Sequence, residues 1–136
     1  MNLYTKIIPI LLIGTLFLHG GTLTNDEEVP RDIVIAFKVG TAKELARFFN
    51  DNLELAVGEK EDVYSKSQAE RIMDNFFVNH PPKSFEFIHQ GGKESARYAI
   101  GKLVTFNGEF RVYLLLKKNN KGRSLIHQLR IENEIE

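Results

Sequence analysis

The sequence predicts a fold of the α+β class, with helices in the first part of the domain and an antiparallel sheet in the last part. The first observation is the stretch 84–132, which reads as four consecutive strands. The second is the pair Asn107-Gly108, which stands between alternating apolar residues and marks a hairpin turn. The third is the helical spacing of apolar side chains before residue 80.

Two short helices are expected at the start of the domain. Pro30 suits a first helical turn and Gly40 suits a helix end, so the first helix lies between them. Thr41 begins the second helix, and Glu44 three residues later predicts a capping box. The buried side of this helix is expected to consist of Leu45, Phe48 and Phe49, and Asn50-Asp51-Asn52 is expected to end it.

A strand and a third helix complete the first half. Alternation of apolar residues predicts a strand over 53–57, and residues 63–64 form a short strand after a polar turn. Ser65 and Gln68 predict a second capping box, and the helix that follows is stopped by His80-Pro81-Pro82. We expect this helix to fill the concave side of the sheet with Ile72, Met73, Phe76 and Phe77.

The predicted hairpin has two unlike faces. With Asn107 and Gly108 at the centre of a type I′ turn, Phe106 lies opposite Glu109, and the turn sets the register. The core face is an apolar row of Phe110, Val112, Leu114 and Leu116, opposed by the small residues Ala99 and Gly101. The other face is half apolar, and we expect it to be a homodimer interface formed by Tyr98, Ile100, Lys102, Val104, Arg111, Tyr113 and Leu115. The alternative is a monomer in which the Lys and Arg stems cover this patch.

Composition and charge narrow the class of protein. The chain has 136 residues, which predicts one domain, and 18 basic residues balance 18 acidic ones. This balance argues against nucleic acid as a partner. Cysteine is absent, the histidines are isolated, and no G-x-G-x-x-G, G-x-x-x-x-G-K or G-x-S-x-G motif occurs. We therefore expect no metal and no cofactor.

Residues 1–21 are expected to be a signal peptide. Lys6 precedes an apolar run over 7–18, which is too short to span a bilayer, and small residues follow it. The domain then occupies residues 22–136, and the protein is exported to the periplasm or the extracellular space without a stable membrane span. The alternative is an N-terminal anchor that is not cleaved.

Six stretches link the chain to a known superfamily. They are Ala42-Lys43-Glu44-Leu45-Ala46, Val63-Tyr64-Ser65-Lys66, Phe76-Phe77, Pro81-Pro82-Lys83-Ser84-Phe85, Tyr98-Ala99-Ile100-Gly101 and Phe110-Arg111-Val112-Tyr113. With these stretches, the chain resembles a family of small exported bacterial proteins of unknown function within the nuclear-transport-factor-2-like superfamily, which includes ketosteroid isomerases, scytalone dehydratase and SnoaL-like cyclases. The resemblance implies a cone-shaped fold, with N-terminal helices packed on a curved antiparallel sheet, and a tendency to dimerise through the sheet. It implies no active site, because none of the stretches is a catalytic motif.

Two histidines are the candidate catalytic residues. Enzymes of that superfamily use an acid or a base inside the cone. Alternation places His127 on the face of Leu125, Leu129 and Ile131, and His89 on the face of Phe85 and Phe87. Either could act as a general base in an apolar pocket; the alternative is a structural histidine. The four-stranded stretch contains no Asp, which counts against an enzyme.

The pocket predicted inside the cone is apolar and aromatic. Its expected lining is Phe37, Phe48, Phe76, Phe77, Phe87, Val112, Leu114, His127 and Leu129. We expect a non-enzymatic exported domain that binds an apolar small ligand or a protein partner through its cone or its sheet face. The alternative is an enzyme of isomerase or dehydratase type that uses the pocket histidines. A cavity of about 300 Å³ or more that contains both histidines would favour a ligand or an enzyme.

Overall fold

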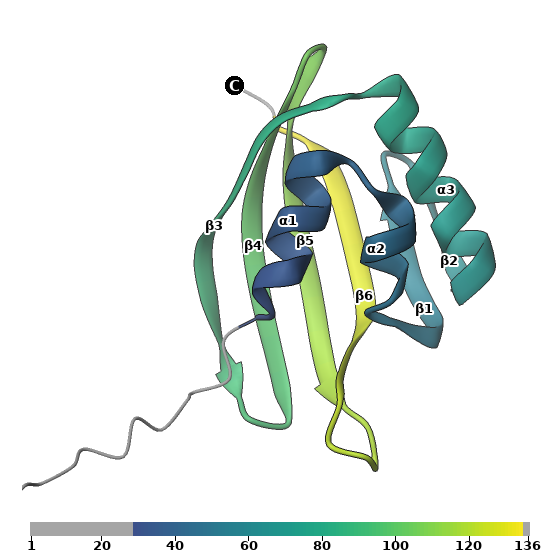
Figure 1. Ribbon diagram of the computed structural model, residues 1–136, viewed down its shortest axis with the longest axis vertical. Helices are drawn as coiled ribbons and strands as arrows, with labels where there is room; N and C mark the ends of the chain where they lie inside the picture. The colour runs from purple at the N-terminus through teal and green to yellow at the C-terminus, as the bar shows by residue number, and fades with distance from the viewer. Residues whose placement is uncertain (1–28, 135–136) are drawn as a thin grey trace, which may run out of the picture.

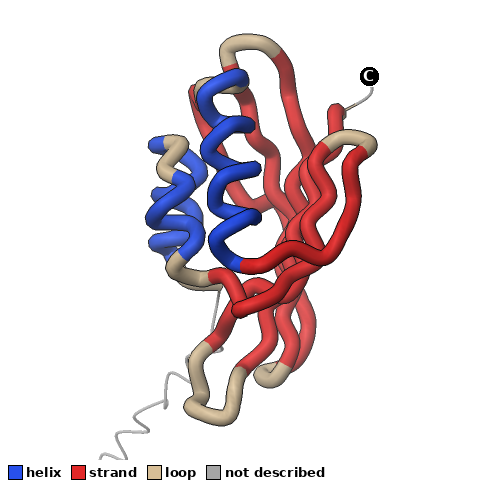
Figure 2. Tube along the Cα trace, turned by 90° about the vertical axis from the view of Figure 1, so that its right-hand side faces the viewer, coloured by secondary structure: helices blue, strands red, loops and turns tan. Residues whose placement is uncertain are grey.

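The computed structural model describes residues 29–134 as three helices packed on one face of a curved sheet (Figures 1 and 2). The helices are α1 (Arg31–Val39), α2 (Ala42–Ala46) and α3 (Lys66–Asn79). The strands are β1 (Phe49–Val57), β2 (Lys60–Ser65), β3 (Pro82–Lys93), β4 (Ala96–Thr105), β5 (Gly108–Lys118) and β6 (Ser124–Asn133). This architecture confirms the predicted α+β class. The signal peptide predicted at 1–21 lies outside the described residues.

All six strands form one sheet in the order β2-β1-β6-β5-β4-β3. The predicted four-stranded antiparallel run from β3 to β6 is confirmed. Strand β1 pairs with β6 in parallel, which was not predicted. It begins at Phe49, so Asn50-Asp51-Asn52 belongs to a strand and does not simply end a helix.

The ends of α1 lie where they were predicted. Pro30 precedes the helix, and Gly40 follows it with a φ of 75°, a left-handed conformation that glycine adopts without strain. The second helix differs from the prediction at its start. Thr41 makes no side-chain capping bond, so the predicted capping box is wrong, and Glu44 pairs instead with Arg47 at 3.0 Å.

The third helix has the predicted cap and the predicted buried side. The Ser65 hydroxyl accepts a hydrogen bond from the backbone N–H of Gln68, and the Gln68 side chain accepts one from the backbone N–H of Ser65. Ala69, Met73, Phe76 and Phe77 are buried, and Ile72 is half-buried. These side chains pack α3 against the sheet. This packing sets the position of a site between the helix and the strands.

The β4–β5 hairpin keeps its predicted faces but has a different register. Thr105 lies opposite Gly108 and Leu103 opposite Phe110, so the predicted pairing is wrong by two residues. The two-residue loop is Phe106-Asn107, and Gly108 begins β5 with a φ of 143°. A shift by an even number preserves the side of every residue. The core row Phe110, Val112, Leu114 and Leu116 is accordingly buried.

The interior of the cone is filled by aromatic and aliphatic side chains. The Phe37 ring of α1 stacks on Phe85 of β3 with a centroid distance of 4.5 Å, and Phe77 meets Phe37 edge-on at 5.9 Å. A Cβ at Gly101 would lie 2.5 Å from the Phe85 ring, so this glycine permits the close approach that its place in a strand predicts.

Candidate functional site

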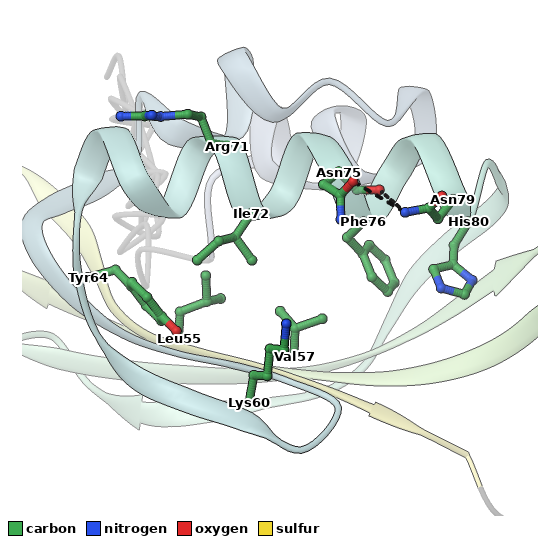
Figure 3. A pocket seen from close by; sticks show the side chains of 10 residues that line it. All are labelled: Leu55, Val57, Lys60, Tyr64, Arg71, Ile72, Asn75, Phe76, Asn79 and His80. Carbon is green, nitrogen blue, oxygen red and sulfur yellow. Dashed lines mark hydrogen bonds between the residues drawn. The ribbon is translucent and has the colours of Figure 1, made fainter.

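A cleft of about 500 Å³ lies between α3 and the β1–β2 hairpin (Figure 3). This volume is in the range typical of small-molecule sites. The cleft is lined by Leu55, Val57, Lys60, Tyr64, Arg71, Ile72, Asn75, Phe76, Asn79 and His80. A cavity is therefore present, but it lies to one side of the filled cone interior.

Apolar side chains form the two long walls of this cleft. The alternation of β1 turns Leu55 and Val57 toward the helix, and the helical spacing of α3 turns Ile72 and Phe76 toward the strand (Figure 3). Tyr64 of β2 lies at the end of the cleft nearest the start of α3. These walls suit the apolar body of a ligand.

His80 and its neighbours form the opposite end of the cleft. His80 Nδ1 lies 3.0 Å from Asn107 Oδ1, and Asn107 Nδ2 donates to the carbonyl of Asn79 at 2.7 Å. Because the amide nitrogen of Asn107 donates, its oxygen is the acceptor, so Nδ1 of His80 carries the hydrogen. The acceptor nitrogen of the neutral ring is then Nε2.

Two phenylalanines hold the His80 ring in place. Its centroid lies 4.8 Å from that of Phe76 and 4.9 Å from that of Phe110. In the sequence, His80 carries only the signal of a residue that stops a helix before two prolines. Its place in the cleft depends on the contact between the end of α3 and the β4–β5 turn, which no local pattern reveals.

The lining of the cleft carries cations but no carboxylates. The Lys60 side chain points into the cleft beside Val57, whereas Arg71 lies at the rim and extends away from it (Figure 3). Within residues 29–134, Lys60 has neither a hydrogen bond nor an ion pair from its ammonium group.

The residues predicted to line a pocket are mostly core residues. Only Phe76 lines the cleft. Phe48 and Phe87 are partly buried against the core, and the fully packed members of the set are Phe37, Phe77, Val112, Leu114 and Leu129. The predicted pocket was placed at the centre of the cone, which these large side chains fill.

The face predicted for His127 is wrong, because β6 contains a bulge at this residue. Leu115 pairs with Gln128 and Leu116 pairs with Ile126, so His127 is the extra residue between them. Ile126 consequently joins Leu129 on the core face. His127 lines a second cleft of about 320 Å³, together with Asn52, Leu53, Glu54, Val63, Leu115, Lys117 and Gln128.

The surroundings of His127 disfavour its charged form. Burial lowers its pKa below the ordinary value of 6.5, and the positive charge of Lys117 lowers it further. The neutral imidazole is therefore favoured in this second cleft.

The face predicted for His89 is wrong for the same reason. Phe87 pairs with Gly101 and His89 pairs with Ile100, so Ile88 is an extra residue in β3. His89 is exposed on the sheet face opposite the helices, and its Nε2 lies 2.9 Å from the Tyr98 hydroxyl. Neither predicted histidine faces the cleft beside α3.

Two features are absent from residues 29–134. No three His, Asp or Glu side chains in this range gather as a metal site requires. No helix in the range is long and apolar enough to cross a bilayer.

Comparison with known proteins identifies similar chains of unknown function. A crystal structure from Bacteroides uniformis is 37% identical and has a TM-score of 0.76, covering 80% of this chain and 100% of its own. One from Bacteroides ovatus is 35% identical with a TM-score of 0.75, covering 80% and 98%. Both are described as DUF4783 family proteins. No protein among the curated sequences matches this one.

A designed protein shares the architecture at low identity. The structure described as Rd1NTF2_04 with long sheet is 15% identical, with a TM-score of 0.61 over 74% of this chain and 94% of its own. At this identity the likeness concerns the fold, and it confirms the predicted nuclear-transport-factor-2-like cone. The sequence profile of a domain of unknown function, DUF4783, matches residues 30–132. The chain therefore belongs to the DUF4783 family, and its fold is nuclear-transport-factor-2-like.

Proposed function

We propose that this domain binds an apolar small molecule in the cleft between α3 and the β1–β2 hairpin and does not act as an enzyme. The observation that carries the proposal is a cleft of about 500 Å³ whose long walls are Leu55, Val57, Ile72 and Phe76. A cleft with apolar walls favours occupation by an apolar molecule.

The position of the histidines supports binding over catalysis. The alternative of an isomerase or dehydratase depended on His127 and His89 as bases in an apolar pocket. Both lie on the sheet face away from the helices, where His127 lines a different cleft and His89 is exposed. The basis for assigning these two residues to a shared pocket is thereby removed.

Binding of a neutral dye tests the proposal. Nile red fluorescence should rise when the dye enters an apolar cleft. Ile72→Trp should fill the cleft and weaken binding at least about tenfold, which corresponds to about 1.4 kcal/mol. Val78→Trp is the matched control, because Val78 lies on the same helix but is 69% exposed and outside the cleft.

The outcomes separate the alternatives. Loss of dye binding in Ile72→Trp with retention in Val78→Trp supports the proposal, provided that circular dichroism shows both variants folded. Equal dye binding by the two variants, or none by the wild type at high micromolar protein, contradicts it.

We also propose that the chain forms a homodimer through the sheet face opposite the helices. Within the described residues, no helix covers this face (Figure 2). Tyr98 and Tyr113 stack across β4 and β5 with a centroid distance of 6.4 Å. The pairing of these strands puts Ile100 opposite Tyr113 and Leu115 opposite Tyr98, which makes a continuous apolar strip. Such strips commonly mark protein interfaces.

Export remains a proposal that depends on the sequence of residues 1–21 alone. The mass of the mature protein tests it, because cleavage near residue 21 would leave a chain that begins within the stretch before Val29. A full-length chain that begins at Met1 and stays in the cytoplasm would contradict it.

A further inference from the structure

We infer that the ligand of the cleft is an amphipathic anion, with a carboxylate or a similar group bound by Lys60 and an apolar body between α3 and β1. The inference deepens the proposed function and depends on it. The observation that carries it is an ammonium group that points into the cleft and has no partner among residues 29–134, where the lining includes no acidic side chain.

The position of Lys60 follows from the β1–β2 hairpin. Lys60 is the register partner of Val57, the residue at the end of the apolar strand wall. Partners in a strand pair project to the same side of the sheet, so Lys60 shares the helix-facing side with Val57. Its ammonium group stands beside the Val57 side chain and faces α3 across the cleft (Figure 3).

The nearby carboxylates do not line the cleft. Asp62 lies two residues along β2, but its side chain accepts a hydrogen bond from the Val63 N–H at 2.7 Å and does not line the cleft. Glu61 pairs with Arg130 at 2.7 Å. Glu59 belongs to the turn before β2 and does not line the cleft either.

The acidic residues of α3 lie on its far side. A helix turns through about 100° per residue, so Glu70 and Asp74 project roughly opposite to Ile72. Neither is among the lining residues. Lys60 is thus the one charge of the described lining that is directed into the cleft, and a ligand group would be its first partner there.

Loss of water from the Lys60 ammonium group on ligand binding should make the cleft selective for anions. A neutral apolar ligand that covers the cleft removes water from the ammonium group without offering it a partner, and this costs free energy. An anionic ligand replaces the water with a charge-assisted hydrogen bond. The same lysine should therefore favour an anion over a neutral molecule of the same shape.

Decanoate and 1-decanol test the inference, because they share an apolar chain and differ in charge at neutral pH. Calorimetry on the wild type should show tighter binding of decanoate. Lys60→Gln should weaken decanoate binding about five- to tenfold and leave decanol binding within about twofold, which is the effect of one partly desolvated ion pair of about 1 kcal/mol. Added salt should weaken the binding of decanoate and not that of decanol.

Lys43→Gln is the matched control, because Lys43 is an exposed lysine of α2 outside the cleft. Retention of decanoate affinity by Lys43→Gln together with its loss in Lys60→Gln supports the inference. If the wild type binds both compounds equally, or if Lys60→Gln changes both equally, the anion inference is overturned while the proposed apolar site stands. If the wild type binds neither compound, the proposed function fails, and the inference fails with it.

Discussion

At the scale of single residues, one extra residue in a strand decides which side of the sheet a histidine occupies. Ile88 in β3 and His127 in β6 are each such residues. Beyond a bulge, every side chain changes face relative to strict alternation. This explains why Ile126 is in the core and why the two histidines are not. It also explains why the Gln90 side chain, and not that of His89, accepts a hydrogen bond from the backbone N–H of Val29 at 3.3 Å.

The bulged position of His127 predicts a pKa below 6.5. Burial and Lys117 both disfavour the imidazolium, so an NMR titration should place its midpoint below that value. Lys117→Gln should raise the pKa partway, because burial is the larger cause. Lys121→Gln, in the β5–β6 loop, is the control and should leave it unchanged.

This pKa also predicts the sign of a pH effect on stability. Because the folded-state pKa is the lower one, the unfolded chain binds the proton more readily. The stability that the neutral His127 contributes is complete above pH 6.5 and is lost as the pH falls through the folded-state value. A midpoint at or above 6.5 in the folded protein would contradict the burial of this ring.

At the scale of elements, the same sequence signature gives two different helix starts. Thr41 with Glu44 and Ser65 with Gln68 both have capping-box spacing, but only the second box forms. Helix α2 has 5 residues and follows the left-handed Gly40 at once, and Arg47 holds the Glu44 carboxylate. Because the Glu44 carboxylate pairs with Arg47, it is not available to the backbone N–H of Thr41, and the capping box of this short helix does not form.

Alanine substitutions at the two caps measure this difference. Ser65→Ala removes an acceptor for a backbone N–H and should lower the free energy of unfolding by about 1 kcal/mol. Thr41→Ala removes no capping bond and should cost less than about 0.5 kcal/mol. Urea unfolding monitored by circular dichroism gives both values. Equal losses in the two variants would mean that the caps do not differ in solution.

Local patterns predict the elements well because each rests on contacts between near neighbours. Pro30 and Gly40 delimit α1, and the Ser65 cap begins α3, as expected. The hairpin register is a different case, because pairing Thr105 with Gly108 leaves every side chain on the face that the predicted pairing also gives. Alternation cannot distinguish registers that differ by two residues.

Contacts between distant segments account for what the sequence did not reveal. The cleft needs β1 beside β6, α3 across β1, and His80 held by Asn107 of a remote turn. The prediction placed large apolar residues around an empty pocket. Large apolar side chains instead pack against one another and fill the core. The cleft instead lies where the lining is mixed, with Lys60 and two asparagines among its apolar side chains.

At the scale of the whole molecule, the sheet has one face covered by helices and one face without such cover among residues 29–134 (Figures 1 and 2). The charged residues on the second face are partly neutralised by neighbours: Lys102 pairs with Glu109 at 3.3 Å, and Arg130 pairs with Glu61. What remains is the apolar strip around Tyr98 and Tyr113. Association through this strip would leave the α3 cleft, on the opposite face, open to ligand.

The dimer proposal predicts the mass of the particle in solution. Size-exclusion chromatography with light scattering on residues 22–136 should give twice the mass of one chain. Tyr113→Glu places a charge in the middle of the strip and should yield a folded monomer, because an unpaired charge is costly in an apolar interface. Val78→Glu adds the same charge at an exposed valine of α3 and should remain a dimer. A monomeric wild type would contradict the proposal and would leave the strip free for a different protein, whereas a Tyr113→Glu variant that stays dimeric would move the interface to another surface.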